Sequence, residues 1–540
     1  MISSSALRRL ALPAIVTVGG IGTWATITTV NDDWDDYIPR TTSSSSNGKK
    51  KERIVILGSG WGGLNVLQKC AAPDKDIVMV SPRPHFLYTP LLAGSAVGTI
   101  TLRSACEPLR ALVEAASHKG GGATFVRAEA RQVDFEQQKV YASTGAGKGM
   151  EVLELDYDQL IIAVGAQPNT FGIPGVQEHA LFLKEAEDSA KLHAKLLSNL
   201  EKASALLMMN QPSPSIEKEI DRLLTVVVVG GGPTGVELSA ELADFVQSDV
   251  SKRYGSDVSE RIQIILVEAM PRILAPFDAK LAQVARQHLE ERGVEVRTTV
   301  AITKVEDETR AILAPSTPRN ATTAQKKAAA AQAYSQDTGV LVWAAGIGPR
   351  KIVKTMAQSL QQSDTRGLKV DEYLRVSGAK NVYAIGDAAL SGLAPTAQVA
   401  AQQGKYIGRA LRDGTEKPFV YQHAGSLCCL GTGNGIAQLT NNNNKIWEAI
   451  GASSSSSDNN KQQSFVTGTP AFALWRSLYW TRLLSTSSRF SLSMDWLRSL
   501  YSGRDVVEPV LKRTPTLSFG TPLQRNSSIR KTTVQANSPK

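Results

Sequence analysis

The sequence predicts an α/β fold with two parallel-sheet domains, followed by an amphipathic helical segment toward the C-terminal end. Two stretches, 53–80 and 225–267, each contain a buried strand, a glycine-rich loop, a helix and a second buried strand. A third stretch, 471–504, spaces leucine and aromatic residues with helical periodicity among arginines. The 540 residues exceed the size of one hydrophobic core, and 42% hydrophobic residues suffice for several cores.

The first unit begins with residues 53–57 (RIVIL), a β-branched run typical of a buried strand, and ends in the strand at 76–80 (DIVMV). The loop between them carries the three glycines of a GxGxxG pattern, Gly58, Gly60 and Gly63. The first glycine allows a tight turn, the second lets the backbone approach a pyrophosphate, and the third allows close packing of helix and strand. The helix N-terminus attracts the phosphate charge, so we predict nucleotide binding here.

The second unit repeats this pattern after residues 225–229 (TVVVV), with the glycines Gly230, Gly232 and Gly235. Its next strand, 262–267 (IQIILV), ends in Glu268. A carboxylate there accepts hydrogen bonds from both ribose hydroxyls and repels a 2′-phosphate, which favours NADH over NADPH. Arg272 is close enough in sequence to weaken that preference, and an ordinary surface glutamate is the alternative interpretation.

At the corresponding position of the first unit the sequence has Ser81, which binds a ribose hydroxyl only weakly. The first loop therefore does not choose between FAD and NAD by itself. Two nucleotide-binding units in one chain can hold one fixed cofactor and one substrate. The economical interpretation is FAD plus a nicotinamide, with hydride passing between stacked rings.

Three further strand ends support two dinucleotide-binding domains. Residues 157–165 (YDQLIIAVG) and 339–346 (GVLVWAAG) each end in a small-residue turn, at Gly165 and Gly346. They look like the paired crossover segments that end the nucleotide-binding halves of two-dinucleotide flavoproteins. A third strand ends in Gly386 and Asp387, where a carboxylate can bond a hydroxyl of FAD.

Composition excludes several other classes. Four cysteines (Cys70, Cys106, Cys428 and Cys429) without a CxxC pattern disfavour a disulfide scaffold, a dithiol enzyme and a structural zinc site. Six histidines show no HxxxH or HExxH spacing, and no calcium-binding loop pattern occurs, so we predict no metal. The net charge of +10 is too diffuse to indicate nucleic-acid binding.

Taken together, these motifs resemble those of two-dinucleotide-binding flavoproteins, similar to glutathione reductase in fold with two Rossmann-like domains. More closely, residues 53–504 resemble the type II (alternative, rotenone-insensitive) NADH:quinone oxidoreductases of mitochondria and bacteria. The specific marks are 81–92 (SPRPHFLYTPLL), 230–237, 384–388, 397–400 (AQVA) and the closing Trp/Arg-rich segment. The resemblance implies a flavoenzyme on the mitochondrial inner membrane that oxidises NADH, reduces ubiquinone and pumps no protons. It also makes a serine at Ser81 expected.

The resemblance also implies site residues. Non-covalent FAD would be held by Gly58, Gly60, Gly63, Ser81, Thr89, Pro90, Leu91, Gly165, Gly386 and Asp387. NADH would be held by Gly230, Gly232, Gly235, Glu268 and Gly346. Glu237 would lie near the nicotinamide–flavin contact, where it positions the carboxamide or delivers protons toward quinone. The alternative role of Glu237 is a charge matched to the helix dipole.

Gln398 and Gln402 lie four residues apart in 397–405 (AQVAAQQGK), so a helix would place them on one face. The N-terminus of such a helix can stabilise a reduced, anionic flavin. Gln398 resembles the glutamine at the quinone site of the family, and we predict a catalytic role for both residues. An ordinary packing helix of alanine and glutamine is the alternative.

The stretch 471–504 carries five arginines against the single acid Asp495, namely Arg476, Arg482, Arg489, Arg498 and Arg504. Basic, aromatic amphipathic helices lie in a membrane interface, and a lipid quinone must be reached from the bilayer. No charge-free run of 20 residues occurs here, so we expect the segment to lie on the membrane. A docked helical hairpin or a homodimer contact is the alternative.

Residues 1–31 are basic and lack acids, which is typical of an organelle targeting segment, although a secretory signal or a retained anchor over the uncharged 10–30 also fits. The expected organisation is a targeting segment and linker (1–50), an FAD-binding domain in two parts (53–221 and 346–420), an NADH-binding domain (222–345), a membrane-associating region (421–510) and a disordered basic tail (511–540). The low-complexity stretches 322–333, 441–444 and 453–457 are expected to be surface loops. The membrane face and the oligomeric state are left open.

Two other functions are kept. A sulfide:quinone oxidoreductase shares the fold but needs cysteines flanking the flavin, and adjacent Cys428 and Cys429 fit buried small residues better than an exchanging pair. A redox-sensing flavoprotein that resembles apoptosis-inducing factor would hold a long-lived NADH–flavin complex with little quinone reduction. Residues 397–400 and the terminal helices argue against it.

Overall fold

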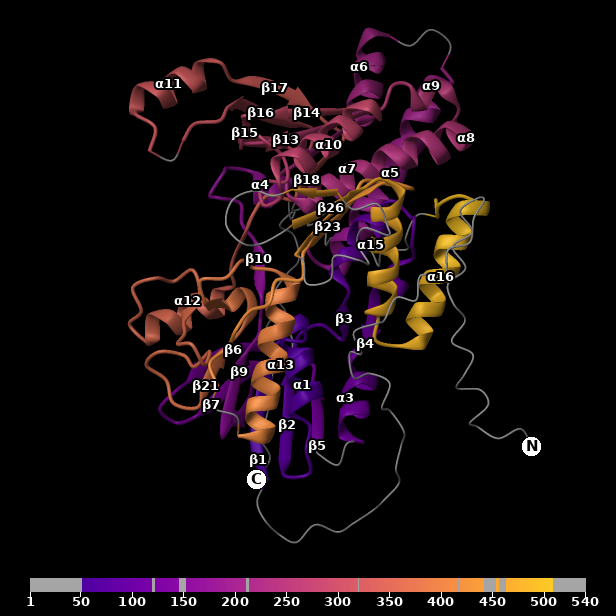
Figure 1. The fold of residues 1–540 in the computed structure, drawn as a ribbon. Helices are drawn as coiled ribbons and strands as arrows, with labels where there is room; N and C mark the ends of the chain where they lie inside the picture. The colour runs from indigo at the N-terminus through magenta and orange to yellow at the C-terminus, as the bar shows by residue number, and fades with distance from the viewer. Residues whose placement is uncertain are drawn as a thin grey trace, which may run out of the picture. The chain divides into compact units, whose positions relative to one another are not determined.

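The computed structural model describes residues 51–118, 122–144, 152–209, 213–318, 320–414, 417–440, 453–455 and 463–507 (Figure 1). The predicted targeting segment with its uncharged stretch 10–30, the stretch 441–444 and the basic tail 511–540 lie outside these residues. The expectations for them therefore stay predictions.

The first sheet has five parallel strands in the order β21-β9-β1-β2-β5. Their bounds are β1 Glu52–Leu57, β2 Lys75–Val80, β5 Gly122–Val126, β9 Gln159–Ile162 and β21 Val382–Ala384. Ile54 and Ile56 pack into the core on the side of α1 (Trp61–Cys70). Val55 and Leu57 pack into a second core with α12 (Lys351–Ser359) and the three-stranded sheet of β6 (Glu129–Asp134), β7 (Lys139–Ser143) and β8 (Val152–Asp156). Both faces of a parallel sheet are covered, which explains the uninterrupted apolar run of β1.

The second sheet has five parallel strands in the order β11-β18-β12-β13-β14. Their bounds are β11 Leu181–Phe182, β12 Thr225–Val229, β13 Gln263–Glu268, β14 Val294–Thr298 and β18 Val340–Trp343. The chain enters this sheet at Leu181, which differs from the boundary expected at residue 222. The helix α5 (Ala186–Leu207) that follows β11 is fastened to the same domain, since the Asn199 amide donates to the carbonyl of Gly339 at 3.0 Å.

In each domain a helix directly follows the glycine loop: α1 in the first domain and α7 (Pro233–Phe245) in the second. Helix α13 (Ala397–Asp413) lies along α1, as Figure 1 shows. Gly404 and Gly408 allow this approach, because a Cβ on Gly404 would overlap the carbonyl oxygen of Gly62. The late segments β21 and α13 thereby complete the first domain after the chain has passed through the second.

Two short strands link the domains. β10 (Ala166–Pro168) pairs antiparallel with β19 (Ile347–Pro349), directly after β9 and β18 end. They directly follow the segments 157–165 and 339–346, which the sequence analysis predicted to be paired crossover segments. Gly165 and Gly346 precede the two strands with φ of +67° and +70°, a conformation that glycine adopts without strain.

Two of the predicted loops contain regular structure. Residues 453–455 of the stretch 453–457 form strand β25, and a second predicted loop is a helix. The stretch 322–333 forms α11 (Thr323–Ala331), which stands between β16 (Arg310–Pro315) and β17 (Tyr334–Asp337). The surface-loop expectation was wrong because alanine, lysine and glutamine are strong helix formers, and Thr322 and Gln325 make a capping box at its start. The helix is exposed along its length, so the composition alone sustains it.

The C-terminal region is a four-stranded antiparallel sheet followed by two helices. The strands are β23 (Ser426–Cys429), β24 (Gly435–Thr440), β25 (Ser453–Ser455) and β26 (Gln463–Thr467), and the helices are α15 (Thr469–Thr481) and α16 (Thr486–Tyr501). In Figure 1 the yellow helices α15 and α16 stand side by side. Among the described residues, no helix has the length and apolar character needed to cross a membrane.

Candidate active site

The first glycine loop has the geometry of a pyrophosphate cradle. Gly58 has φ of +105°, and a Cβ there would overlap the carbonyl oxygen of Ala163. A Cβ on Gly63 would overlap the carbonyl oxygen of Gly58. Gly60 faces open space, with Arg83 Nη2 at 3.7 Å as the nearest atom to a Cβ built there. The loop thus leaves room beside the N-terminus of α1, which fits the phosphates of FAD.

The second glycine loop repeats this geometry. Gly230 has φ of +112°, and a Cβ there would lie 2.8 Å from the carbonyl of Ala344. A Cβ on Gly235 would overlap the carbonyl oxygen of Gly230, while Gly232 has no atom within 4 Å of the corresponding position. The N-terminus of α7 faces that open side, so this loop also fits a dinucleotide phosphate.

The residues at the ends of the second strands differ between the two units. The Ser81 hydroxyl is buried and lies 2.8 Å from the Ser59 hydroxyl. The Glu268 carboxylate accepts hydrogen bonds from the backbone N–H of Gly231 at 2.6 Å and of Met270 at 2.7 Å. These two donors orient the carboxylate at the edge of its own loop, where a ribose would lie.

Gly386 and Asp387 follow β21 at the edge of the first cradle. The Gly386 N–H donates to Gln403 Oε1 at 2.6 Å, and Gln403 is completely buried. Burial raises the pKa of Asp387, and the Lys184 ammonium at 3.9 Å partly offsets this effect. Gln403 is a residue that the sequence reasoning missed. Nothing in the sequence distinguished it, because a position five residues after Gln398 lies on a different face of an α-helix.

The segment expected to face the flavin forms one turn of 3-10 helix, η2 (Thr89–Leu91), before α2 (Leu92–Ala96). Thr89 Oγ1 accepts a hydrogen bond from the Trp61 indole at 3.1 Å, which ties η2 to the first glycine loop. Pro90 and Leu91 line a cavity of about 20 Å³, room for about one water molecule. Helix α7 contributes Glu237 to the same cavity, so the structure brings these predicted residues together.

Glu237 is the titratable group of this cavity with the clearest perturbation. Burial raises its pKa to about 8, and the hydrogen bond that Oε1 accepts from the Cys429 N–H at 3.0 Å opposes that rise. A carboxyl with this pKa is protonated at neutral pH and can donate a proton. The alternative role, a charge matched to the helix dipole, needs an ionised carboxylate, whereas a pKa of about 8 favours the protonated carboxyl at neutral pH.

The structure places Gln398 and Gln402 on α13 with their amides turned to the loop 421–425. The Gln398 carbonyl oxygen accepts from the Tyr421 hydroxyl at 3.1 Å. Gln402 pairs with both backbone groups of Gln422, at 2.7 and 3.0 Å. Neither side chain lines the cavity that holds Glu237. These bonds fasten the loop to α13, and a catalytic role for the two glutamines stays a prediction.

The sequence reasoning also missed two cavity groups from the C-terminal helices. The Arg476 guanidinium lies between the rings of Phe472 and Trp496, with centroids at 4.5 and 4.6 Å, and burial lowers its pKa. Together with Trp475 it lines the cavity, and its Nε has no hydrogen-bond partner among the described residues. The signal was the helical spacing of residues 472, 475 and 476, which places one basic residue on an aromatic face.

The prediction that all five arginines of 471–504 face a membrane surface is therefore wrong for Arg476 and Arg504. Arg476 is partly exposed, but its guanidinium lies between two aromatic rings and lines the cavity, and Arg504 is 5% exposed among carboxylates. The expectation failed because composition counts charges without showing their direction, and both guanidinium groups find aromatic or acidic partners inside the protein. Arg482, Arg489 and Arg498 are all partly exposed.

The cysteines show no arrangement for thiol chemistry. All four are free, and Cys70, Cys428 and Cys429 are buried. Burial raises the pKa of the Cys106 thiol to about 11 and that of Cys70 to about 12, and it raises the pKa of Cys428 and Cys429 as well. A thiol with a raised pKa is a poor nucleophile. Among the described residues, no group of three or more His, Cys, Asp or Glu side chains could hold a metal ion.

Comparison with known proteins identifies the family of the chain. Residues 52–404 match the family model of the pyridine nucleotide-disulphide oxidoreductases, and residues 423–505 match the NDH2 C-terminal domain. The external NADH-ubiquinone oxidoreductase 2 of Saccharomyces cerevisiae mitochondria is 34% identical, over 87% of this chain and 84% of its own. A mitochondrial internal alternative NAD(P)H-ubiquinone oxidoreductase A1 of Solanum tuberosum is 35% identical, over 86% of this chain and 89% of its own.

Solved structures extend the comparison to the fold. NDH2 from Plasmodium falciparum in complex with NADH superimposes with a TM-score of 0.71 at 26% identity, covering 85% of this chain and 100% of that one. The sulfide:quinone oxidoreductase of Aquifex aeolicus, at 15% identity and a TM-score of 0.58, shares the fold alone. The chain belongs to the pyridine nucleotide-disulphide oxidoreductases and, among them, to the mitochondrial alternative (type II) NADH-ubiquinone oxidoreductases.

Proposed function

We propose that this protein oxidises NADH and reduces ubiquinone in mitochondria without moving protons across the membrane. The observation that carries the proposal is a pair of matching dinucleotide cradles with a cavity beside them that holds a protonatable buried acid. Bound FAD supplies the acceptor for the hydride of NADH and the electron pair for the quinone. The names of the mitochondrial relatives, NADH-ubiquinone oxidoreductases, support this assignment.

The residues of the first domain have the geometry to bind and orient FAD. The backbone of the first glycine loop faces the phosphates, and the η2 turn meets the loop through Thr89 and Trp61. Ser81 and Asp387 present a hydroxyl and a carboxylate for the sugar hydroxyls. Gly165 and Gly386 have positive φ, which lets the backbone approach the cofactor closely.

The second domain holds NADH as a substrate. Gly232 leaves the phosphate side of its loop open, and Glu268 accepts hydrogen bonds from a ribose diol while repelling a 2′-phosphate. Gly346, at the end of β18, would bring the backbone toward the nicotinamide end. Its φ of +70° is a conformation that glycine adopts without strain, which favours glycine at that turn.

Quinone reduction needs two protons as well as two electrons, and Glu237 is suited to deliver one of them. Its raised pKa keeps a proton on the carboxyl at neutral pH, and it shares a cavity with the Arg476 guanidinium. The cavity has room for about one water molecule and not for a quinone ring, so Glu237 would pass its proton toward the quinone through such a water, with the Arg476 cation beside it. Pro90, Leu91 and Trp475 give this cavity apolar walls.

The outer face of α16 supports docking on the inner-membrane surface. Phe490, Met494, Leu497 and Tyr501 follow one another at helical spacing and are exposed by 46–87%, while Leu492 on the opposite side is buried. An apolar stripe beside partly exposed arginines suits anionic headgroups. The alternative is that a second copy of the chain, and not a membrane, covers this face of α16. Flotation of the purified protein with cardiolipin-containing vesicles supports the membrane, whereas a stable dimer that leaves vesicles unbound supports the copy.

The function is tested by two half-reactions in one cuvette. The purified chain should be yellow, should bleach when NADH is added anaerobically, and should regain its colour when a short-chain ubiquinone follows. A colourless protein that binds no added FAD contradicts the assignment. So does a flavin that bleaches but reoxidises no faster with quinone than without it.

The sulfide:quinone alternative depends on thiolates beside the flavin. The raised thiol pKa values and the buried, adjacent positions of Cys428 and Cys429 do not favour it. A variant with all four cysteines changed to serine, retaining NADH-driven quinone reduction within about threefold, would exclude thiol chemistry.

A further inference from the structure

Arg504 lies three residues after the end of α16, in a buried cluster of polar side chains that has no role in the proposed chemistry. Its Nε donates to Thr99 Oγ1 at 2.8 Å, and Nη1 lies 3.0 Å from Asp249 Oδ2. Nη2 reaches Glu241 Oε2 at 3.4 Å, and the Arg504 backbone N–H donates to Asp249 Oδ1 at 2.8 Å. The forked, planar guanidinium satisfies three partners in different directions, which a lysine cannot do.

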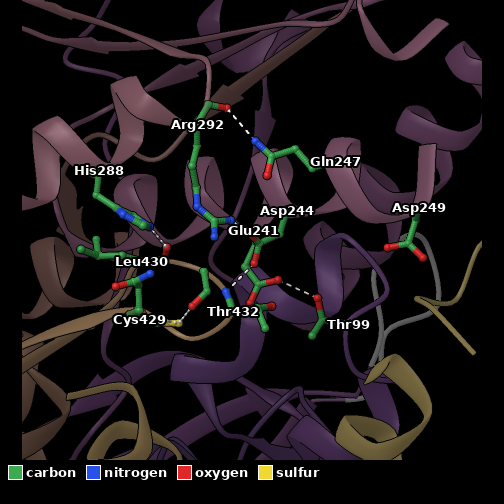
Figure 2. A network of polar contacts seen from close by, with 12 residues as sticks. Thr99, Glu241, Asp244, Gln247, Asp249, His288, Arg292, Cys429, Leu430 and Thr432 are labelled. Carbon is green, nitrogen blue, oxygen red and sulfur yellow. Dashed lines mark hydrogen bonds and ion pairs between the residues drawn. The ribbon is translucent and has the colours of Figure 1, made fainter. Parts of the chain in front are cut away.

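These partners belong to different parts of the molecule. Thr99 follows α2 in the FAD-binding domain. Glu241 lies on α7, and Asp249 lies on the π-helical turn η4 (Val246–Val250) that continues α7 in the NADH-binding domain. The Thr99 hydroxyl donates directly to Glu241 Oε2 at 2.6 Å, the contact drawn in Figure 2. Arg504 therefore stands at the junction of both nucleotide-binding domains and the C-terminal segment.

Besides Arg504, the acidic residue Asp495 attaches the C-terminal segment to the FAD-binding domain. Asp495 of α16 accepts hydrogen bonds from the Thr101 N–H at 2.8 Å and from the Ser104 hydroxyl at 2.7 Å. The Asp505 N–H also donates to the carbonyl of Gly98 at 2.9 Å. Residues 495–505, which we call the strap, therefore connect the segment 98–104 to α7, with contacts at both ends of the strap.

The charge balance makes Arg504 hard to replace. Asp244 and Asp249 each have 3% of the side chain exposed, and Glu241 has 14%. Arg292 pairs with Asp244, whose other oxygen accepts from the Thr432 N–H, as Figure 2 shows for the backbone contact. Without Arg504, Asp249 and Glu241 lose their nearest cation and are drawn toward water or a proton. Either response moves η4 and the middle of α7.

That movement would reach the cavity. Thr99 and Glu241 both line it, and Glu241 lies one helical turn after Glu237 on α7. We propose that Arg504 is a positioning residue for quinone reduction, because it holds the wall formed by residues 94–100 against the wall formed by Glu237 and Glu241. The inference rests on the proposed function and assigns the quinone half-reaction, rather than NADH oxidation, as the step that depends on the strap.

The test separates the two half-reactions by anaerobic stopped-flow. In Arg504→Met we expect reoxidation of the reduced flavin by short-chain ubiquinone in detergent to slow by about tenfold or more, with bleaching by NADH within about twofold of wild type. Arg504→Lys should be intermediate, because an ammonium keeps the charge but loses the fork. Arg366→Met is the matched control. The Arg366 side chain is 80% exposed and pairs with Asp364, and neither residue belongs to the strap or the cavity, so both half-reactions should stay within about twofold.

A second variant distinguishes positioning from bulk stability and serves if Arg504→Met does not fold. Arg504→Met/Asp249→Asn removes the cation together with its closest acid, so the melting temperature should recover toward wild type. Quinone reoxidation should stay slow, because Thr99 and Glu241 still lack their partner. Recovery of the quinone rate together with the melting temperature would overturn the proposal.

The other outcomes are equally decisive. An Arg504→Met or Arg504→Lys protein that reoxidises at the wild-type rate overturns the positioning role, as does an equal slowing of both half-reactions. If the wild-type flavin is not reoxidised by quinone at all, the proposed function falls and this inference falls with it.

Discussion

The two glycine loops have nearly the same backbone and different chemistry at the end of the following strand. In each, the first glycine has a positive φ above 100°, the last glycine packs against the carbonyl of the first, and the middle glycine faces open space. The first unit ends with Ser81 bonded to another serine, and the second ends with Glu268 held by two backbone N–H groups. The comparison teaches that the loop backbone provides the pyrophosphate site in both units, while the side chain after the second strand determines how the ribose hydroxyls are bound.

The largest expected effect comes from breaking one loop at a time. Gly63→Ala should give a colourless protein, because the Cβ overlaps the backbone of its own loop and the FAD cradle cannot close. Gly235→Ala should stay yellow but bleach with NADH at least about 100-fold more slowly, because only the second cradle is lost. The flavin spectrum and stopped-flow bleaching measure the two effects.

Gly122→Ala is the control for these loop variants, since its Cβ would meet only an ordinary contact at 3.6 Å from Asp76. It should keep both the colour and the bleaching rate. If Gly235→Ala lost FAD while Gly63→Ala retained it, the assignment of the two loops would be reversed.

The next effect concerns Glu237, which follows the second loop on α7. Glu237→Gln keeps an acceptor for the Cys429 N–H but removes the proton, so flavin reoxidation by quinone should slow by about 10- to 100-fold. Bleaching by NADH should change much less. The exposed residue Glu260, changed to glutamine, is the control and should leave both rates unaltered. Equal slowing of both steps would favour carboxamide positioning over proton delivery.

The pH dependence of this step has a definite sign. Burial raises the pKa of Glu237 from about 4.5 to about 8, so the proton donor is present below pH 8 and is lost above it. Quinone reoxidation should therefore decline as pH rises through about 8, with a slope that Glu237→Gln removes. A wild-type profile that is flat between pH 6 and 9 would contradict the role of Glu237.

The same shift affects stability. Between about pH 4.5 and 8 the folded state binds the Glu237 proton that the unfolded state has released, so wild-type stability should fall as pH rises through this window. Glu237→Gln should show a shallower decline of melting temperature and a higher value than wild type at pH 8.5. A variant less stable than wild type at every pH would place Glu237 in an ionised network instead.

A smaller effect is expected at Glu268, where the two units differ most. Glu268→Gln removes the charge that repels a 2′-phosphate and keeps one acceptor, so kcat/KM for NADPH should rise by about tenfold. The value for NADH should fall only a few-fold. Steady-state kinetics with both nucleotides check this, and an unchanged NADPH value would mean that Glu268 only shapes its loop.

The smallest effect belongs to Ser81. Ser81→Ala removes one buried hydroxyl pair, worth about 1 kcal/mol, so FAD affinity should fall by about five- to tenfold and the colour should persist at ordinary FAD concentrations. Titration of the apoprotein with FAD measures it. A colourless Ser81→Ala protein would make the hydroxyl as important as the glycines and would remove the contrast between the two strand ends.

The fold could be predicted because its main signals are local. A β-branched run, glycines at fixed spacing and an apolar helix specify each strand–loop–helix unit within about 30 residues. Glu268 at the end of its strand is also readable along the chain. The basic, acid-free ends (1–31 and 511–540) could be interpreted only from their composition, and they lie outside the described residues.

The site was predictable only in part, because its members come from distant segments. Pro90 and Leu91 were expected at the flavin, and Glu237 close to it, yet nothing local showed that Arg476 shares their cavity. Gln398 and Gln402 have the right helix and spacing, but their amides are engaged by the loop 421–425. Spacing gives the face of a helix and does not give the element that covers it.

By itself, the sequence determined two dinucleotide-binding units, the order in which the chain builds them, and the glycines that no other residue can replace. Only the tertiary structure decided which partners each charge meets, as Arg476 between aromatic rings and buried Arg504 among acids show. The physical reason is range. Backbone conformation at a glycine depends on its immediate neighbours. The environment of a charge depends on segments that can be far away in sequence, as in the contact of Arg504 with Thr99 over 405 positions.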